Sequence, residues 1–189
     1  MRPIFLSLGS INITWFLLFF ITLTIIGYII LKMIIKDNKY KKIIEDYYLL
    51  ELIVGFMGAR LIYVLFNLDL YRGRLMDAIR PNHYNLNLIG GVIVAVILLF
   101  IMTKRKKEPF LEILNRLLVP FYFGMSIGIW VSQFEGIFSN WNTSETLIYS
   151  IMFFVILIIH SSLFERYKNI GIITLSLSMI IYYFLGIIF

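Results

Sequence analysis

The chain contains no cysteine and only two histidines among its 189 residues. The lack of cysteine excludes disulfide bonds, a thiol nucleophile and a cysteine-ligated metal site. The histidines, His83 and His160, lie far apart in the sequence and form no metal-ligand spacing. We therefore expect no metal or other cofactor, and we expect His160 to form hydrogen bonds between helices.

Charge is also scarce, since charged residues make up 15% of the chain and hydrophobic residues 60%. Soluble domains carry about 25% charged residues. Several apolar runs approach the roughly 20 residues that an α-helix needs to cross a bilayer. This composition excludes an ordinary soluble domain and predicts an integral membrane protein.

Six apolar stretches predict an all-α fold, a polytopic membrane bundle of about six transmembrane helices. We expect a single integral membrane domain over residues 1–189, with spans at 11–35, 47–66, 84–103, 117–138, 146–164 and 170–189. The first stretch is longer than the apolar region of a secretory signal and has no small-residue cleavage site. We therefore expect it to remain as a membrane helix.

The basic residues between these stretches are distributed unevenly. Twelve follow the first, third and fifth spans, and four lie on the other side (Arg2, Arg72, Arg74 and Arg80). Cytoplasmic loops carry the excess of Lys and Arg, so both termini are predicted to lie outside, on the side of the membrane away from the cytoplasm. The net charge of +6 then follows from membrane topology, and nucleic-acid binding is not expected.

Arg60 is the charged residue farthest inside an apolar stretch, within the run from Tyr47 to Phe66. A guanidinium at the bilayer centre costs at least about 2.5–3.5 kcal/mol. Such a group is retained where it faces a protein interior, a polar cavity or an anionic ligand. Two interpretations follow: a packing arginine paired with a carboxylate, or part of a polar site that binds a lipid headgroup.

Glu135 is the candidate partner of Arg60, because both residues are predicted to lie in the outer half of the bilayer. The fourth span has small residues at every fourth position, which favours close helix packing: Gly124, Gly128, Ser132 and Gly136. Glu135 and Ser132 could form a purely structural contact with Arg60, or could line an outer-leaflet polar pocket together with Gln133.

The third span begins with a polar cluster. Asn85 and Asn87 precede a helix start, where free backbone N–H groups favour an anion such as phosphate. Ordinary N-capping is the alternative. Gly90 and Gly91 permit close approach of a helix or a lipid. His83 lies two residues earlier and is a candidate catalytic base, or simply a solvated interfacial histidine.

The segment Asn67–His83, also on the outer side, is amphipathic. One interpretation is a re-entrant or interfacial helix at the outer headgroups. The other is that its three arginines attract lipid phosphate toward the bundle. The two interpretations are compatible, and both make anionic phospholipid a partner.

Several short blocks, in a shared order, resemble the prolipoprotein diacylglyceryl transferase family. Those bacterial enzymes transfer diacylglyceryl from phosphatidylglycerol to the lipobox cysteine of a lipoprotein precursor. The blocks are Pro3–Gly9 with Ile13–Phe16, Gly58–Phe66, Leu88–Gly91, Lys104–Lys107 with Pro109–Phe110, and Gly124 with Ile127 and Gly128. The resemblance implies a role in lipoprotein modification, with phosphatidylglycerol and a lipoprotein precursor as partners.

The chain departs from the family pattern where the family's chemistry is located. Asn85 stands at the position of the family's histidine, Ile129 and Ser132 at those of a signature arginine and asparagine, and Phe16 at that of a tyrosine. The resemblance fades after residue 140. We interpret the chain as a divergent, shortened member, either a transferase with replacement groups or a non-catalytic relative that binds phospholipid or a membrane partner.

Overall fold

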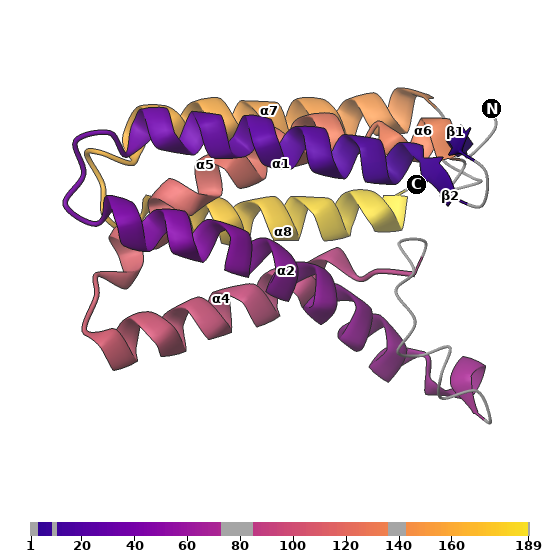
Figure 1. Cartoon of the computed structure of the whole chain (residues 1–189), viewed down its shortest axis with the longest axis horizontal. Coiled ribbons are helices and arrows are strands. Elements are labelled where there is room, and N and C mark those ends of the chain that lie inside the picture. The colour runs from indigo at the N-terminus through magenta and orange to yellow at the C-terminus, as the bar shows by residue number, and fades with distance from the viewer. Residues whose placement is uncertain (1–3, 9–10, 73–84, 136–142, 189) are drawn as a thin grey trace. The chain divides into compact units, whose positions relative to one another are not determined.

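The computed structural model describes residues 4–8, 11–72, 85–135 and 143–188 (Figure 1). The chain divides into two compact units. The first unit comprises residues 1–41 and 111–189, and the second comprises residues 42–110. Within the described ranges, six helices are long and apolar enough to cross a membrane, which confirms the predicted fold class.

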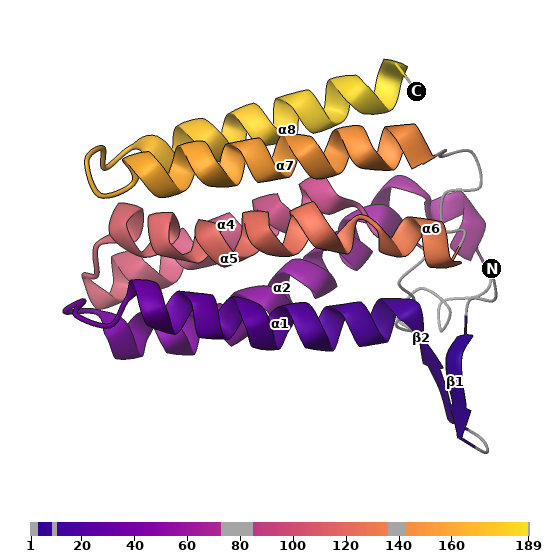
Figure 2. The same cartoon turned by 90° about the horizontal axis from the view of Figure 1, so that it is seen from above.

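The first unit contains a short hairpin and five helices. Its elements are β1 (Ile4–Leu8), β2 (Ile11–Thr14), α1 (Trp15–Ile34), α5 (Phe110–Gly128), α6 (Val131–Glu135), α7 (Thr143–Leu163) and α8 (Ile170–Ile188). Nine of the nineteen residues of α5 are buried, so α5 contributes most to the core of this unit. Helices α7 and α8 run antiparallel and side by side (Figures 1 and 2).

A buried hydrogen-bond network connects α5, α7 and α8. The Nε2–H of His160 donates to the backbone oxygen of Asn115 at 2.8 Å, and its Nδ1 lies 3.0 Å from Thr174 Oγ1. The hydroxyl of Tyr122 donates to the same Thr174 oxygen at 3.1 Å. These contacts confirm that His160 forms hydrogen bonds between helices, since its partners lie on α5 and α8.

Asn115 and its neighbour Arg116 bond to residues in or beside the loops that connect the helices at one end of the first unit. The Asn115 amide donates to Lys168 O at 3.0 Å and accepts from the Gly171 N–H at 2.9 Å. Arg116 donates to Ile34 O at 3.3 Å and forms an ion pair with a Glu165 oxygen, also at 3.3 Å. The segment after α1 and the α7–α8 connection therefore lie at the same end of this unit.

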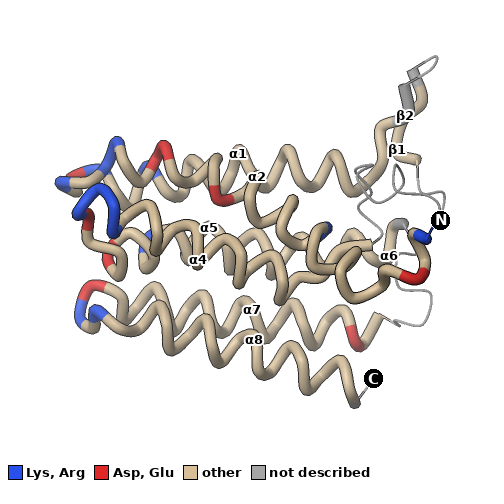
Figure 3. Tube along the Cα trace, turned by 90° about the horizontal axis from the view of Figure 1, so that it is seen from below, with Lys and Arg blue, Asp and Glu red and all other residues tan. Residues whose placement is uncertain are grey.

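In the first unit, Lys and Arg positions gather at the end that carries these connections (Figure 3). This clustering is what the positive-inside rule requires of a cytoplasmic face. The orientation itself stays a prediction. We expect an impermeant thiol reagent applied to intact cells to miss cysteines introduced singly at Tyr40 and Lys106, while the same reagent labels both after permeabilisation. Labelling of either position in intact cells would reverse the assigned orientation.

The second unit contains α2 (Lys41–Phe66), the 3₁₀ turn η1 (Leu68–Tyr71) and α4 (Leu88–Lys106). Helices α2 and α4 approach closely through glycines. A Cβ atom at Gly91 would lie 2.6 Å from the backbone oxygen of Gly55, and one at Gly58 would lie 2.7 Å from Val94 Cβ. A Cβ at Gly90 would collide with the side chain of Ile62. The expected close approach at Gly90 and Gly91 is thus confirmed as helix packing.

Close packing through the small residues of the fourth span was expected as well, and at Gly124 this expectation is wrong. No described heavy atom lies within 4 Å of the Cβ position at Gly124, and Gly128 meets only a side-chain atom of Leu23 at 3.4 Å. The physical reason at Gly124 is that no described helix packs against that position of α5, and the pattern does not continue to Ser132 on one helix because α5 ends at Gly128 and α6 begins at Val131.

Several element boundaries differ from those predicted, including the starts of α2 at Lys41 and of α4 at Leu88. The first helix begins at Trp15, because Ile11–Thr14 pairs with Ile4–Leu8 as an antiparallel strand. Helix α5 begins at Phe110 and contains Pro120, which membrane helices tolerate when neighbouring groups satisfy the freed backbone. Of the segment Asn67–His83, only residues up to Arg72 are described, and its predicted interfacial helix, with Arg74 and Arg80, lies outside the described residues.

Candidate functional site

Arg60 lies on α2, six residues before the end of the helix at Phe66, and is only 8% exposed. Its Nη1 donates a hydrogen bond to the backbone oxygen of Asn85 at 3.2 Å. Its guanidinium carbon lies 5.4 Å from the centre of the Tyr71 ring, a cation–π distance. A carbonyl on one side and an aromatic ring on the other therefore orient the planar guanidinium.

The segment that precedes α4 lies against this part of α2. The backbone N–H of Asn87 donates to Ala59 O at 3.0 Å, one residue before Arg60. The structure thus brings together the predicted residues Arg60, Asn85 and Asn87, although twenty-five positions separate Arg60 from Asn85. The sequence placed all three residues toward the outer side of the membrane but did not predict the contact between Arg60 and Asn85.

Asn87 is the N-cap of α4. Its side-chain oxygen accepts from the Gly90 N–H at 2.8 Å, and its backbone oxygen accepts from the Gly91 N–H at 2.9 Å. Two of the amide groups at this helix start are therefore used within the helix. Gly90 and Gly91 contribute close packing against α2, as described above, and their contact with a headgroup stays a prediction.

Tyr71 was missed by the sequence analysis, although it contacts Arg60 and is 8% exposed. Helical periodicity could not indicate this contact, because α2 ends at Phe66 and the turn η1 changes the direction of the chain before Tyr71. The exposed ion pair between Arg72 and Asp69, at 3.0 Å, closes the same turn.

The chain matches the family model described as prolipoprotein diacylglyceryl transferase over residues 3–188. The chain belongs to this family. Curated relatives named phosphatidylglycerol–prolipoprotein diacylglyceryl transferase include one from Finegoldia magna, 30% identical over 125 residues, which cover 66% of this chain and 50% of the relative. A relative with the same name from Clostridium botulinum is 29% identical over 138 residues, covering 71% and 54% respectively.

The chain spans about half the length of the curated relatives it matches. The family resemblance and the structure agree on one point of geometry. The two most recognisable family-like blocks, Gly58–Phe66 on α2 and Leu88–Gly91 at the start of α4, lie against each other through Ala59, Ile62 and the two glycines. These two family-like blocks therefore form one structural feature of the second unit.

The remaining predicted site residues of this transferase-family chain lie elsewhere or are not described. Ser132 is buried on α6, and its hydroxyl donates to Ile129 O at 2.7 Å. The side chain of Glu135 and the whole of His83 lie outside the described residues. The proposed pairing of Arg60 with Glu135 and the proposed role of His83 as a base therefore stay predictions.

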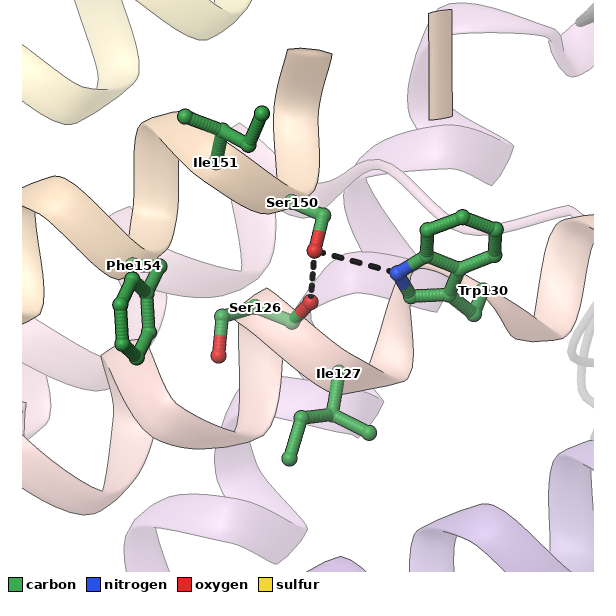
Figure 4. A pocket seen from close by; sticks show the side chains of 6 residues that line it. All are labelled: Ser126, Ile127, Trp130, Ser150, Ile151 and Phe154. Carbon is green, nitrogen blue, oxygen red and sulfur yellow. Dashed lines mark hydrogen bonds between the residues drawn. The ribbon is translucent and has the colours of Figure 1, made fainter. Parts of the chain in front are cut away.

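A hollow of about 300 Å³ opens between α5 and α7 in the first unit. Figure 4 shows its lining residues: Ser126, Ile127, Trp130, Ser150, Ile151 and Phe154. The Ser150 hydroxyl donates to Ser126 O at 2.6 Å and accepts from the Trp130 indole N–H at 3.1 Å. These polar groups bond to one another, so the hydrogen bonds connect α5 to α7. The rest of the lining is hydrocarbon and offers no reactive group.

Proposed function

We propose that this protein binds an anionic phospholipid through Arg60 and acts in the lipid modification of bacterial lipoproteins. Phosphatidylglycerol is the lipid that the relatives' names give, and a lipoprotein precursor is the second partner they imply. The observation that carries the proposal is the buried Arg60 guanidinium, held against the family-like start of α4.

The chemistry of Arg60 suits a phosphate diester. A guanidinium presents several N–H donors in one plane and forms paired hydrogen bonds with phosphate oxygens. In a low-dielectric membrane site such charge-assisted bonds are stronger than in water. Asn85 and Tyr71 orient the guanidinium before any ligand arrives, which lowers the entropic cost of binding.

The reaction itself makes further demands. Diacylglyceryl transfer requires a base for the cysteine thiol and positive charge for the departing phosphate. The position that resembles the family's histidine is occupied by Asn85, and an amide accepts no proton at neutral pH. This observation favours a second candidate function, a non-catalytic relative that keeps the lipid site.

The lipid proposal predicts that the purified protein retains phosphatidylglycerol and that Arg60→Ala weakens this retention. Hydrogen bonds to a charged group contribute about 1.5–3 kcal/mol, so binding should fall by roughly tenfold to a hundredfold. Native mass spectrometry with titrated phosphatidylglycerol measures the change. Arg166→Ala is the matched control, because Arg166 is exposed and follows α7 on the predicted cytoplasmic side, away from the proposed lipid site. Equal retention by both variants would contradict the site.

Activity is tested separately by complementation of a bacterial strain depleted of its own transferase. We expect little or no diacylglyceryl transfer to a lipoprotein, with Asn85 as the physical reason. Robust transfer would establish the enzyme and exclude the non-catalytic candidate. His83→Ala would then identify the base, since loss of transfer in that variant would assign the role to His83.

A further inference from the structure

The hairpin formed by β1 and β2 exposes apolar side chains. Ile4, Phe5 and Leu6 are 41%, 45% and 45% exposed. Leu6 pairs with Ile13 across the hairpin, so these two apolar residues share one face. Ser7, one position further along β1, lies on the opposite face because side chains alternate along a strand. An exposed apolar face of this kind requires a covering partner.

The place of the hairpin in the chain identifies the covering partner. Helix α1 has 20 residues and is therefore about 30 Å long, which matches the hydrocarbon thickness of a bilayer. Its first residue, Trp15, follows β2 directly, and the Thr14 hydroxyl caps the helix by accepting from the Leu17 N–H at 3.3 Å. The hairpin consequently begins where α1 leaves the hydrocarbon.

The direction of the hairpin is the second observation. Figure 2 shows β1 and β2 turned sharply away from the axis of α1 instead of continuing along it. A hairpin in this position runs along the membrane surface when α1 crosses the membrane. Helix α1 itself exposes apolar residues near this end, among them Leu17 and Ile21.

Aromatic contacts fix the hairpin in this position. The rings of Phe5 and Trp15 meet edge to face at 4.7 Å, and Trp15 stacks on Phe134 of α6 at 4.9 Å. Phe19 of α1 also contacts Phe134, at 5.7 Å. Tryptophan is enriched at the membrane–water boundary, where its ring is apolar and its N–H is polar. The hairpin, α1 and α6 therefore share one aromatic cluster.

We propose that the hairpin is a membrane-surface anchor whose Leu6 face inserts between the headgroups and acyl chains of the leaflet in which α1 begins. The occupant of this face is the lipid surface itself. Through Phe5, Trp15 and Phe134 the anchor also sets the height of α6 in the bilayer. This function is independent of the phospholipid site proposed at Arg60.

The test uses the full chain, which is free of cysteine, in phosphatidylglycerol–phosphatidylcholine nanodiscs. Spin labels at Leu6→Cys and Ser7→Cys report their accessibility to oxygen, which concentrates in lipid, and to a water-soluble nickel chelate. Labels at Ile25→Cys and Lys36→Cys provide lipid and water references, because Ile25 is a 56% exposed residue inside α1 and Lys36 follows that helix.

We expect the Leu6 label to be accessible to oxygen and protected from the nickel chelate, as the Ile25 reference is. The Ser7 label should be several-fold more accessible to the nickel chelate than the Leu6 label. Two outcomes overturn the proposal. High nickel accessibility at both positions would place the hairpin in water. Protection of Leu6 from both reagents would show that protein covers it, as when an extended peptide pairs with the free edge of β1. Ile13→Cys, on the same face as Leu6, repeats the measurement if Leu6→Cys fails to fold.

Discussion

Replacing Gly91 by alanine is expected to destabilise the packing of α2 against α4 by about 1–2 kcal/mol. The added Cβ would lie 2.6 Å from the backbone oxygen of Gly55 and 2.9 Å from Ala59 Cβ. A backbone oxygen cannot rotate away as a side chain can, so the helices must separate. Overpacking of this kind costs about 1–3 kcal/mol, and the better helix propensity of alanine returns up to about 1 kcal/mol.

Gly124→Ala is the matched control, since it places the same methyl group on another spanning helix with no described atom within 4 Å. We expect Gly124→Ala to be neutral or slightly stabilising. Unfolding of both variants in mixed micelles, followed by helical circular dichroism, gives the comparison. Equal stability of the two variants would show that the contact between α2 and α4 is looser than described.

Replacing Asn115 by leucine is expected to cost about 2–4 kcal/mol of stability. Leucine keeps the branched shape of the side chain, although it is somewhat larger, and it cannot bond to Lys168 O or to the Gly171 N–H. A buried donor or acceptor left without a partner costs about 1–3 kcal/mol. The loss should appear first as faster hydrogen exchange at the Gly171 amide, because the Asn115 oxygen protects that group directly.

The control for Asn115→Leu is Ser162→Ala. The Ser162 hydroxyl is exposed and bonds only within α7, to Ile158 O and Ile159 O. Its removal should leave stability unchanged within about 0.5 kcal/mol, as for most surface substitutions. If Asn115→Leu were equally harmless, water or another side chain would have to replace both of its bonds.

The helices were largely predictable because hydrocarbon runs of about 20 residues have few alternatives in a membrane. Their beginnings were less predictable. Ile11–Thr14 is apolar and continuous with α1, so hydrophobicity alone cannot distinguish its strand from a further helical turn. The start of α5 was placed too late because Glu112, Asn115 and Arg116 interrupt the apolar pattern, whereas in the fold they make specific contacts.

The candidate site was predictable in part for a similar reason. Arg60 is conspicuous because a charge inside an apolar helix is costly, and Gly90–Gly91 because paired glycines permit close contact. The contact between Arg60 and Asn85 uses a backbone oxygen, which no residue type reveals. Tyr71 reaches Arg60 through a short turn, so no fixed spacing encodes the contact.

The network that joins His160 and Thr174 to α5 has a consequence for membrane insertion. Both residues enter the bilayer on α7 and α8, which follow α5 in the chain, and both are fully or nearly fully buried. Their partners, Tyr122 and the backbone oxygen of Asn115, belong to α5, which is synthesised earlier. Helix α5 thus offers polar acceptors and donors to α7 and α8 as they insert, which favours their packing against α5 over exposure of His160 and Thr174 to lipid.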